Sequence, residues 1–179
     1  RYAEAETLTQ RALKIYEKVN GTEHPEVATS INNLGLLHYR NGSYAEAEAL
    51  YKRALTIRER IHGPEHPELA TVLNNLGLLY DDLGNFAKAE PLYKRALKIQ
   101  EKVYGTEHPD VATSINNLGL LHYKNGSYEE SEALFKKSLA IIEKILDPEH
   151  PDIAMGLNNL ALVYSDIGNF AKAEQLHKR

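Results

Sequence analysis

Apolar positions along the chain follow helical spacing in short stretches that end near glycine. From Pro25 to about Arg40 the apolar residues fall mostly three or four positions apart, which predicts a helix with one buried stripe: Val27, Ala28, Ile31, Leu34, Leu37 and Tyr39. Pro is tolerated in a first helical turn, and Asn41-Gly42 ends the helix because Gly readily adopts the left-handed backbone. A second helix follows to about residue 62, with Ala47, Leu50, Tyr51, Ala54, Leu55, Ile57 and Ile61 on its inner side.

This two-helix pattern returns every 42 residues. The element Asn32-Asn33-Leu34-Gly35 recurs at 74–77 and 116–119, and as Asn-Asn-Leu-Ala at 158–161. A fixed period of about 20 to 50 residues is typical of solenoids, in which each unit buries its apolar face only against its neighbours. We therefore expect an all-α array of nine helices, partial at both ends: a partial repeat at 1–21, repeats at 22–63, 64–105 and 106–147, and a truncated repeat at 148–179.

Polar residues at the helix starts suggest how each helix begins. Ser43 is suited to cap the second helix, with Glu46 three residues on completing a capping box. A His precedes the Pro of every first helix, and we expect these four residues to fix that turn: His24, His66, His108 and His150. Stacking spaces them about 10 Å or more apart, whereas zinc ligands lie about 2.1 Å from one ion. No shared metal is expected.

Composition narrows the classes of function. Charged residues make up 26% and apolar residues 42%, and the net charge of -4 argues against a nucleic-acid binder, which normally shows a basic face. No apolar run approaches the roughly 20 residues of a membrane-spanning helix, and the lack of Cys is compatible with a cytoplasmic location. Catalytic and phosphate-binding motifs are missing. We expect no enzymatic activity, cofactor or metal.

The order of small and large residues resembles the tetratricopeptide repeat (TPR) pattern, which the first full unit shows at Leu34-Gly35, Tyr44, Ala47, Tyr51 and Ala54. Ordinary TPR units have 34 residues, so the eight added here make about two further helical turns. With His-Pro before the first helix and Tyr-Lys-Arg-Ala-Leu at 51–55 and 93–97, the chain is similar to the kinesin light chain subgroup. Near-identical tandem units resemble its bacterial members.

The resemblance implies a right-handed α-α superhelix whose first helices line a concave groove for an extended peptide. Asn side chains both donate and accept, so a row of them can hold a peptide backbone. Alternatively they bridge adjacent first helices, or one Asn of each pair serves each role. The implied groove positions are Thr29, Asn32, Asn33, Leu36, Tyr39, Arg40, Thr71, Asn74, Asn75, Leu78, Asp81, Asp82, Thr113, Asn116, Asn117, Leu120, Tyr123, Lys124, Met155, Asn158, Asn159, Leu162, Ser165 and Asp166.

The edge of this expected groove alternates in character, as Tyr39-Arg40, Asp81-Asp82, Tyr123-Lys124 and Ser165-Asp166. The alternation favours a ligand of mixed charge, or it reflects drift of solvated residues in duplicated two-unit blocks. Two functions therefore stay open. One is a scaffold that binds a protein or peptide partner; the other is a structural spacer or self-associating array, joined end to end through apolar faces of its terminal helices.

Overall fold

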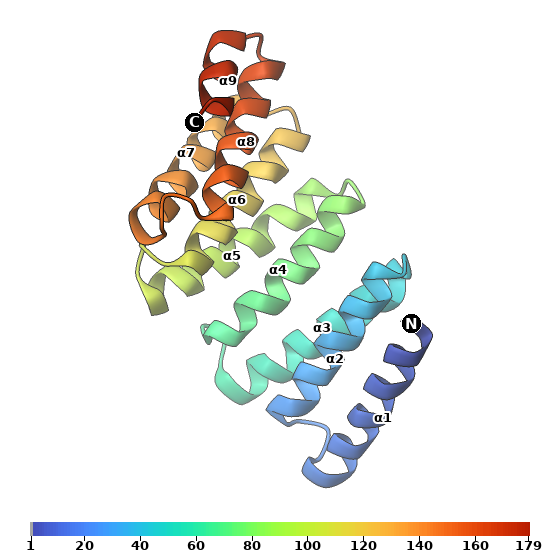
Figure 1. The fold of residues 1–179 in the computed structure, drawn as a ribbon. Coiled ribbons are helices and arrows are strands. Elements are labelled where there is room, and N and C mark those ends of the chain that lie inside the picture. The colour runs from blue at the N-terminus through green and yellow to red at the C-terminus, as the bar shows by residue number, and fades with distance from the viewer. Residues whose placement is uncertain (1) are drawn as a thin grey trace. The chain divides into compact units, whose positions relative to one another are not determined.

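The computed structural model describes residues 2–179, with side chains from residue 4 onward. Within these residues the chain forms nine α-helices and no strand (Figure 1). Their bounds are α1 Tyr2–Asn20, α2 Pro25–Arg40, α3 Tyr44–His62, α4 Pro67–Asp82, α5 Phe86–Tyr104, α6 Pro109–Lys124, α7 Tyr128–Ile145, α8 Pro151–Asp166 and α9 Phe170–His177. The predicted all-α fold is confirmed. The predicted first helices are α2, α4, α6 and α8.

Each of the four first helices has a histidine as its N-cap. Nδ1 of each of the four histidines accepts the backbone N–H two residues later, at 3.2 to 3.4 Å, so the predicted structural role is confirmed. The capping box at Ser43 is wrong. The side chain of Ser43 makes no capping bond at its ψ of 67°, whereas Asn169 accepts the backbone N–H of Lys172 at a similar ψ of 63°. The serine side chain is shorter than that of asparagine and does not reach the helix. The backbone N–H of Ser43 donates to His38 O at 2.9 Å instead.

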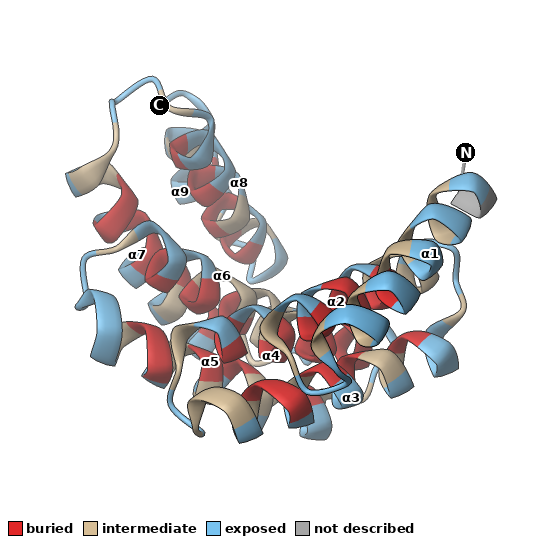
Figure 2. Ribbon diagram, turned by 90° about the horizontal axis from the view of Figure 1, so that it is seen from below, coloured by how far each residue is buried: buried red, intermediate tan, exposed pale blue. Residues whose placement is uncertain are grey.

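The chain packs as two compact units, residues 1–92 and 93–179, which divide inside α5. In the first unit, α2, α3 and α4 bury their apolar stripes against one another around Ile31, Tyr51 and Leu73. The second unit repeats this with α6, α7 and α8, where Ile115 and Phe135 are buried in one cluster. Figure 2 shows buried segments alternating with exposed ones along α3 and α7, as expected where one side of a helix is buried. Polar faces of the first helices are thereby left at the surface.

The first and second helices of a repeat approach each other closely at a glycine, which is Gly35 in the first compact unit and Gly119 in the second. A Cβ atom added at Gly35 would lie 2.8 Å from the ring of Tyr51, and one at Gly119 would lie 2.7 Å from the ring of Phe135. These separations are shorter than any van der Waals contact, so the aromatic ring occupies the space that a side chain would need. Gly35 and Gly119 therefore allow the first and second helices of these two repeats to pack this closely.

None of the helices in the described residues combines enough length with enough apolar character to cross a bilayer.

Candidate functional site

The predicted groove residues divide by exposure. Thr29 and Asn33 of α2 are exposed, as are Leu78 of α4, Thr113 of α6 and Asn158 of α8. Two predicted residues are buried, Asn32 at 7% exposure and Asp81 at 4%, and so lie inside the helix packing rather than where a ligand would meet them. The remaining predicted positions are exposed or half-buried.

Asparagine pairs join neighbouring first helices in both units. Asn75 Nδ2 donates to Asn32 Oδ1 at 3.0 Å, and Asn159 Nδ2 donates to Asn116 Oδ1 at 2.9 Å. Each bond therefore links the first Asn of one repeat to the second Asn of the next. Of the alternatives that the sequence left open, bridging holds for these four residues. An amide group has four hydrogen-bonding positions, so Asn116 and Asn159 retain N–H and carbonyl capacity for a ligand.

The alternating groove edge has the same arrangement. Tyr39 donates its hydroxyl hydrogen to Asp82, and Tyr123 donates to Asp166 Oδ2 at 2.6 Å. The hydrogen bond with Asp166, together with burial, raises the pKa of Tyr123 to about 12. Burial, together with the bond to Asp82, raises the pKa of Tyr39. The Tyr and Asp positions alternate along the sequence because they pair across adjacent helices, a reading that the sequence alone did not suggest.

One buried cation was missed by the sequence analysis. Arg58 of α3 is 6% exposed, and its guanidinium donates to Thr29 Oγ1 at 3.0 Å and to the carbonyl oxygen of Glu68. Burial lowers the pKa of Arg58, and Glu68 opposes that shift. The signal was present, because position 58 continues the inner stripe of Tyr51 and Ala54 at helical spacing.

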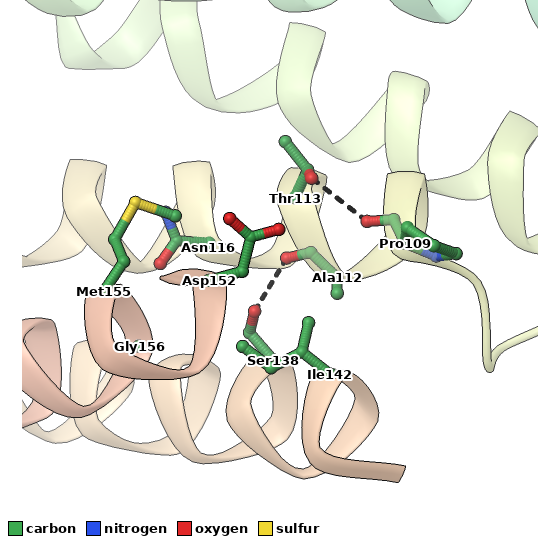
Figure 3. A pocket seen from close by; sticks show the side chains of 9 residues that line it. All are labelled: Pro109, Ala112, Thr113, Asn116, Ser138, Ile142, Asp152, Met155 and Gly156. Atoms are coloured by element: carbon green, nitrogen blue, oxygen red, sulfur yellow. Dashed lines mark hydrogen bonds between the residues drawn. The ribbon is translucent and has the colours of Figure 1, made fainter. Parts of the chain in front are cut away.

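In the second unit, Ile142 stands at the repeat position of Arg58, and a cavity lies beside it. It has a volume of about 40 Å³ and lies between α6, α7 and α8. Figure 3 shows Thr113 and Asn116 of α6 on one side and Asp152 and Met155 of α8 on another, with Ile142 of α7 near Ala112. Since Thr113 and Met155 are exposed first-helix residues, the cavity opens on the face that carries the predicted groove positions.

A cluster of possible metal ligands lies where α3 ends and α4 begins. The rings of His62 and His66 stack with centroids 4.2 Å apart, and one ligand atom each of His62, His66 and Glu68 lies within 4.8 Å of the others. His66 Nδ1 already accepts the backbone N–H of Glu68, and Arg58 Nε lies 3.9 Å from Glu68 Oε2. The helix cap and the nearby positive charge both compete with a bound cation.

Comparison with known proteins places these features in a family. The family model for the tetratricopeptide repeat matches residues 1–60, 31–102, 82–126 and 110–179. No curated protein sequence matches the chain. Among solved structures, BtubC (BKLC) from P. vanneervenii is similar with a TM-score of 0.90 and 28% identity, over 99% of this chain and 71% of that one.

A kinesin light chain-like protein of Podosopora anserina with nearly identical TPR-like repeats is similar as well. Its TM-score is 0.82 at 28% identity, over 99% of this chain and 84% of that one. The structural neighbours are thus kinesin light chain-like TPR proteins, as the 42-residue repeat and the His-Pro element predicted. The matched segments together run from the first residue to the last, and the chain belongs to the tetratricopeptide repeat family.

Proposed function

We propose that the chain is a non-enzymatic scaffold that binds an extended segment of a partner protein along its first helices. The observation that carries the proposal is the Asn116–Asn159 bond, because both amides keep donor and acceptor capacity beside exposed neighbours. In the second unit, Thr113 precedes Asn116 by about one turn on α6, and Asn158 directly precedes Asn159 on α8. Both of these neighbours are exposed. Amide groups held in place in this way bind a main chain at a reduced cost in conformational entropy.

Apolar contacts supplement these amides. Leu78 is 38% exposed on α4, and Leu162 and Met155 are about half exposed on α8. An extended peptide points alternate side chains to opposite sides, so one set of its side chains can meet Leu162 and Met155 of the second unit while its backbone meets the Asn116–Asn159 amides. Proteins with this repeat generally mediate protein–protein interaction and lack catalysis, which supports the proposal.

The test uses peptides selected from a displayed random library against the whole chain. Their affinity is measured by calorimetry for the wild type and for Asn158→Ala. Loss of one hydrogen bond should weaken binding roughly two- to tenfold, from about 0.5 to 1.5 kcal/mol. Gln175→Ala is the matched control, since it removes an exposed amide from α9, outside the predicted groove. Equal losses in the two variants, or no loss in either, would contradict the proposal.

A second candidate function is self-association, and exposed apolar residues on α1 favour it. Leu8, Ile15 and Val19 are 60%, 52% and 73% exposed, and their spacing of seven and four residues places them on one stripe of the helix. A second copy of the chain could cover this stripe. In that case the array acts as a spacer in a larger assembly, and its test is the oligomeric state.

A further inference from the structure

The cavity between α6, α7 and α8 has a filled counterpart within the same chain. Two steps of 42 residues separate Arg58 from Ile142, and the same two steps separate Thr29 from Thr113 and Glu68 from Asp152. In the first unit the Arg58 guanidinium sits between Thr29 and Glu68, held by Thr29 Oγ1 and by the carbonyl oxygen of Glu68. In the second unit the corresponding residues Thr113 and Asp152 line the cavity.

The hydrogen-bonding groups of the filled site are preserved around the cavity. Thr29 Oγ1 donates to Pro25 O at 3.0 Å, and Thr113 Oγ1 donates to Pro109 O at the same distance (Figure 3). A threonine hydroxyl that donates one bond still has lone pairs to accept another. Thr29 accepts from Arg58, and Thr113 is oriented by the same bond to do so. The Asp152 carboxylate, with His150 Nδ1 3.7 Å away, adds negative charge at the opening.

In the second unit, Ile142 stands at the position of Arg58, and its shorter apolar side chain leaves the space open. Gly156 stands where the first unit has Val72, and a Cβ there would lie 3.1 Å from Leu139 Cδ1 and 3.3 Å from Ile142 Cδ1. Ile142 thus packs over Gly156 and supplies no polar head group. The intermediate repeat has Gln100 at this position, and Ser114 Oγ donates to Gln100 Oε1 at 2.5 Å. In the repeats at 22–63, 64–105 and 106–147, the first two therefore hold a buried polar head group at this position, and the third leaves a cavity.

We propose that this cavity binds the guanidinium group of an arginine in the partner segment, in the place that Arg58 fills in the first unit. The proposal rests on the scaffold function proposed above. A water molecule needs about 10 to 15 Å³ of such volume, so 40 Å³ holds about three groups of that size. A planar guanidinium donates in several directions at once, to the Thr113 hydroxyl, to the Asp152 carbonyl and to its carboxylate, which one ammonium group reproduces less well.

The chain contains a single methionine, Met155, and it lines the cavity. Its ¹³C-labelled methyl group gives one NMR signal that reports on this place. The probes are three blocked pentapeptides, four glycines around a central arginine, lysine or neutral citrulline. We expect the arginine peptide to shift the signal saturably and citrulline to bind roughly tenfold more weakly or worse, because bonds from charged donors are the stronger ones. Equal responses to arginine and citrulline would overturn the proposal.

Three variants complete the test. Ile142→Arg supplies the guanidinium from the chain itself and should abolish the response of Met155 to the arginine peptide. Asp152→Asn, at an exposed residue, should weaken that response several-fold without affecting folding. Glu68→Gln makes the corresponding change beside the filled site and should leave the response as in the wild type. An Ile142→Arg protein that responds like the wild type would refute the cavity as the binding place.

The outcome can be told apart from failure of the scaffold proposal. If library peptides bind and depend on Asn158 while arginine and citrulline act alike at Met155, only the arginine cavity is refuted. If the arginine peptide shifts Met155 and no selected peptide depends on Asn158, the cavity stands and the scaffold along the first helices is refuted.

Discussion

At the scale of single residues, glycine under an aromatic ring decides how closely two helices pack. Gly119→Ala introduces a Cβ atom about 2.7 Å from the ring of Phe135, so either the ring or the helix must shift. Overpacking of this kind costs about 1 to 3 kcal/mol, and we expect that loss in the free energy of unfolding measured with urea. Phe135→Leu should cost less in the Gly119→Ala background than in the wild type. Additive effects of the two changes would contradict the steric explanation.

The same position shows what the sequence could and could not predict. The resemblance to the TPR pattern singled out the Leu-Gly pair, and in the fold Gly35 and Gly119 lie against an aromatic ring of the paired helix. Ala161 takes the place of Gly in the last repeat, and Tyr51 corresponds there to His177, which is exposed. The departure from Gly thus occurs where the residue at the aromatic position is solvated. Periodicity alone could not supply this reason, because it depends on which side chain covers the position in space.

At the scale of elements, adjacent first helices are joined by side-chain bonds between residues 43 positions apart. That separation is one repeat plus one residue, and it follows from the stagger between neighbouring helices. The sequence predicted the repeat, the helix bounds and the histidine turns, which depend on local patterns. It could not predict which Asn accepts from which, or that Tyr123 pairs with Asp166, because stagger is a property of packing.

The Tyr123–Asp166 bond should make stability depend on pH in the alkaline range. The pKa of Tyr123 is raised from 10.0 to about 12 in the folded chain, so its contribution is fully present below pH 10. Between those values the unfolded chain loses the tyrosine proton and the folded chain keeps it, so that stability falls as pH rises through this range. Tyr123→Phe should lower Tm below pH 10 and differ little from the wild type near pH 12.

A difference in Tm between wild type and Tyr123→Phe that stays constant from pH 8 to 12 would contradict this assignment. The wild type must be compared with Tyr123→Phe because other tyrosines also contribute to the pH dependence of Tm. Burial raises the pKa of Tyr51 to about 12 as well. Asp166→Asn is the matched variant from the other helix. It removes the charge that holds the hydroxyl proton and should reduce the alkaline dependence in the same direction.

At the scale of the whole molecule, the two compact units share several side-chain bonds between helices. Tyr80 donates to Glu48 Oε1 at 2.7 Å in the first unit, and Tyr164 donates to Glu132 Oε1 at 2.8 Å in the second. This similarity agrees with the duplication of a two-repeat block that the sequence indicates. The units diverge at Arg58 and Ile142, where one is filled by a charged side chain and the other holds a cavity. The hydrogen-bonding groups that hold Arg58 in the first unit therefore recur around an open space in the second.

Self-association also belongs to this scale, and the apolar stripe of α1 makes it testable. Sedimentation velocity over a hundredfold range of concentration should show a rising sedimentation coefficient for the wild type, and none for Leu8→Glu combined with Val19→Glu, because a charge is costly to bury without a partner. Val103→Glu is the control, since Val103 is an exposed apolar residue that belongs to α5 and not to the stripe. It should associate like the wild type. A wild type that remains monomeric throughout would refute the self-associating array and leave the partner-binding scaffold as the function that the surface supports.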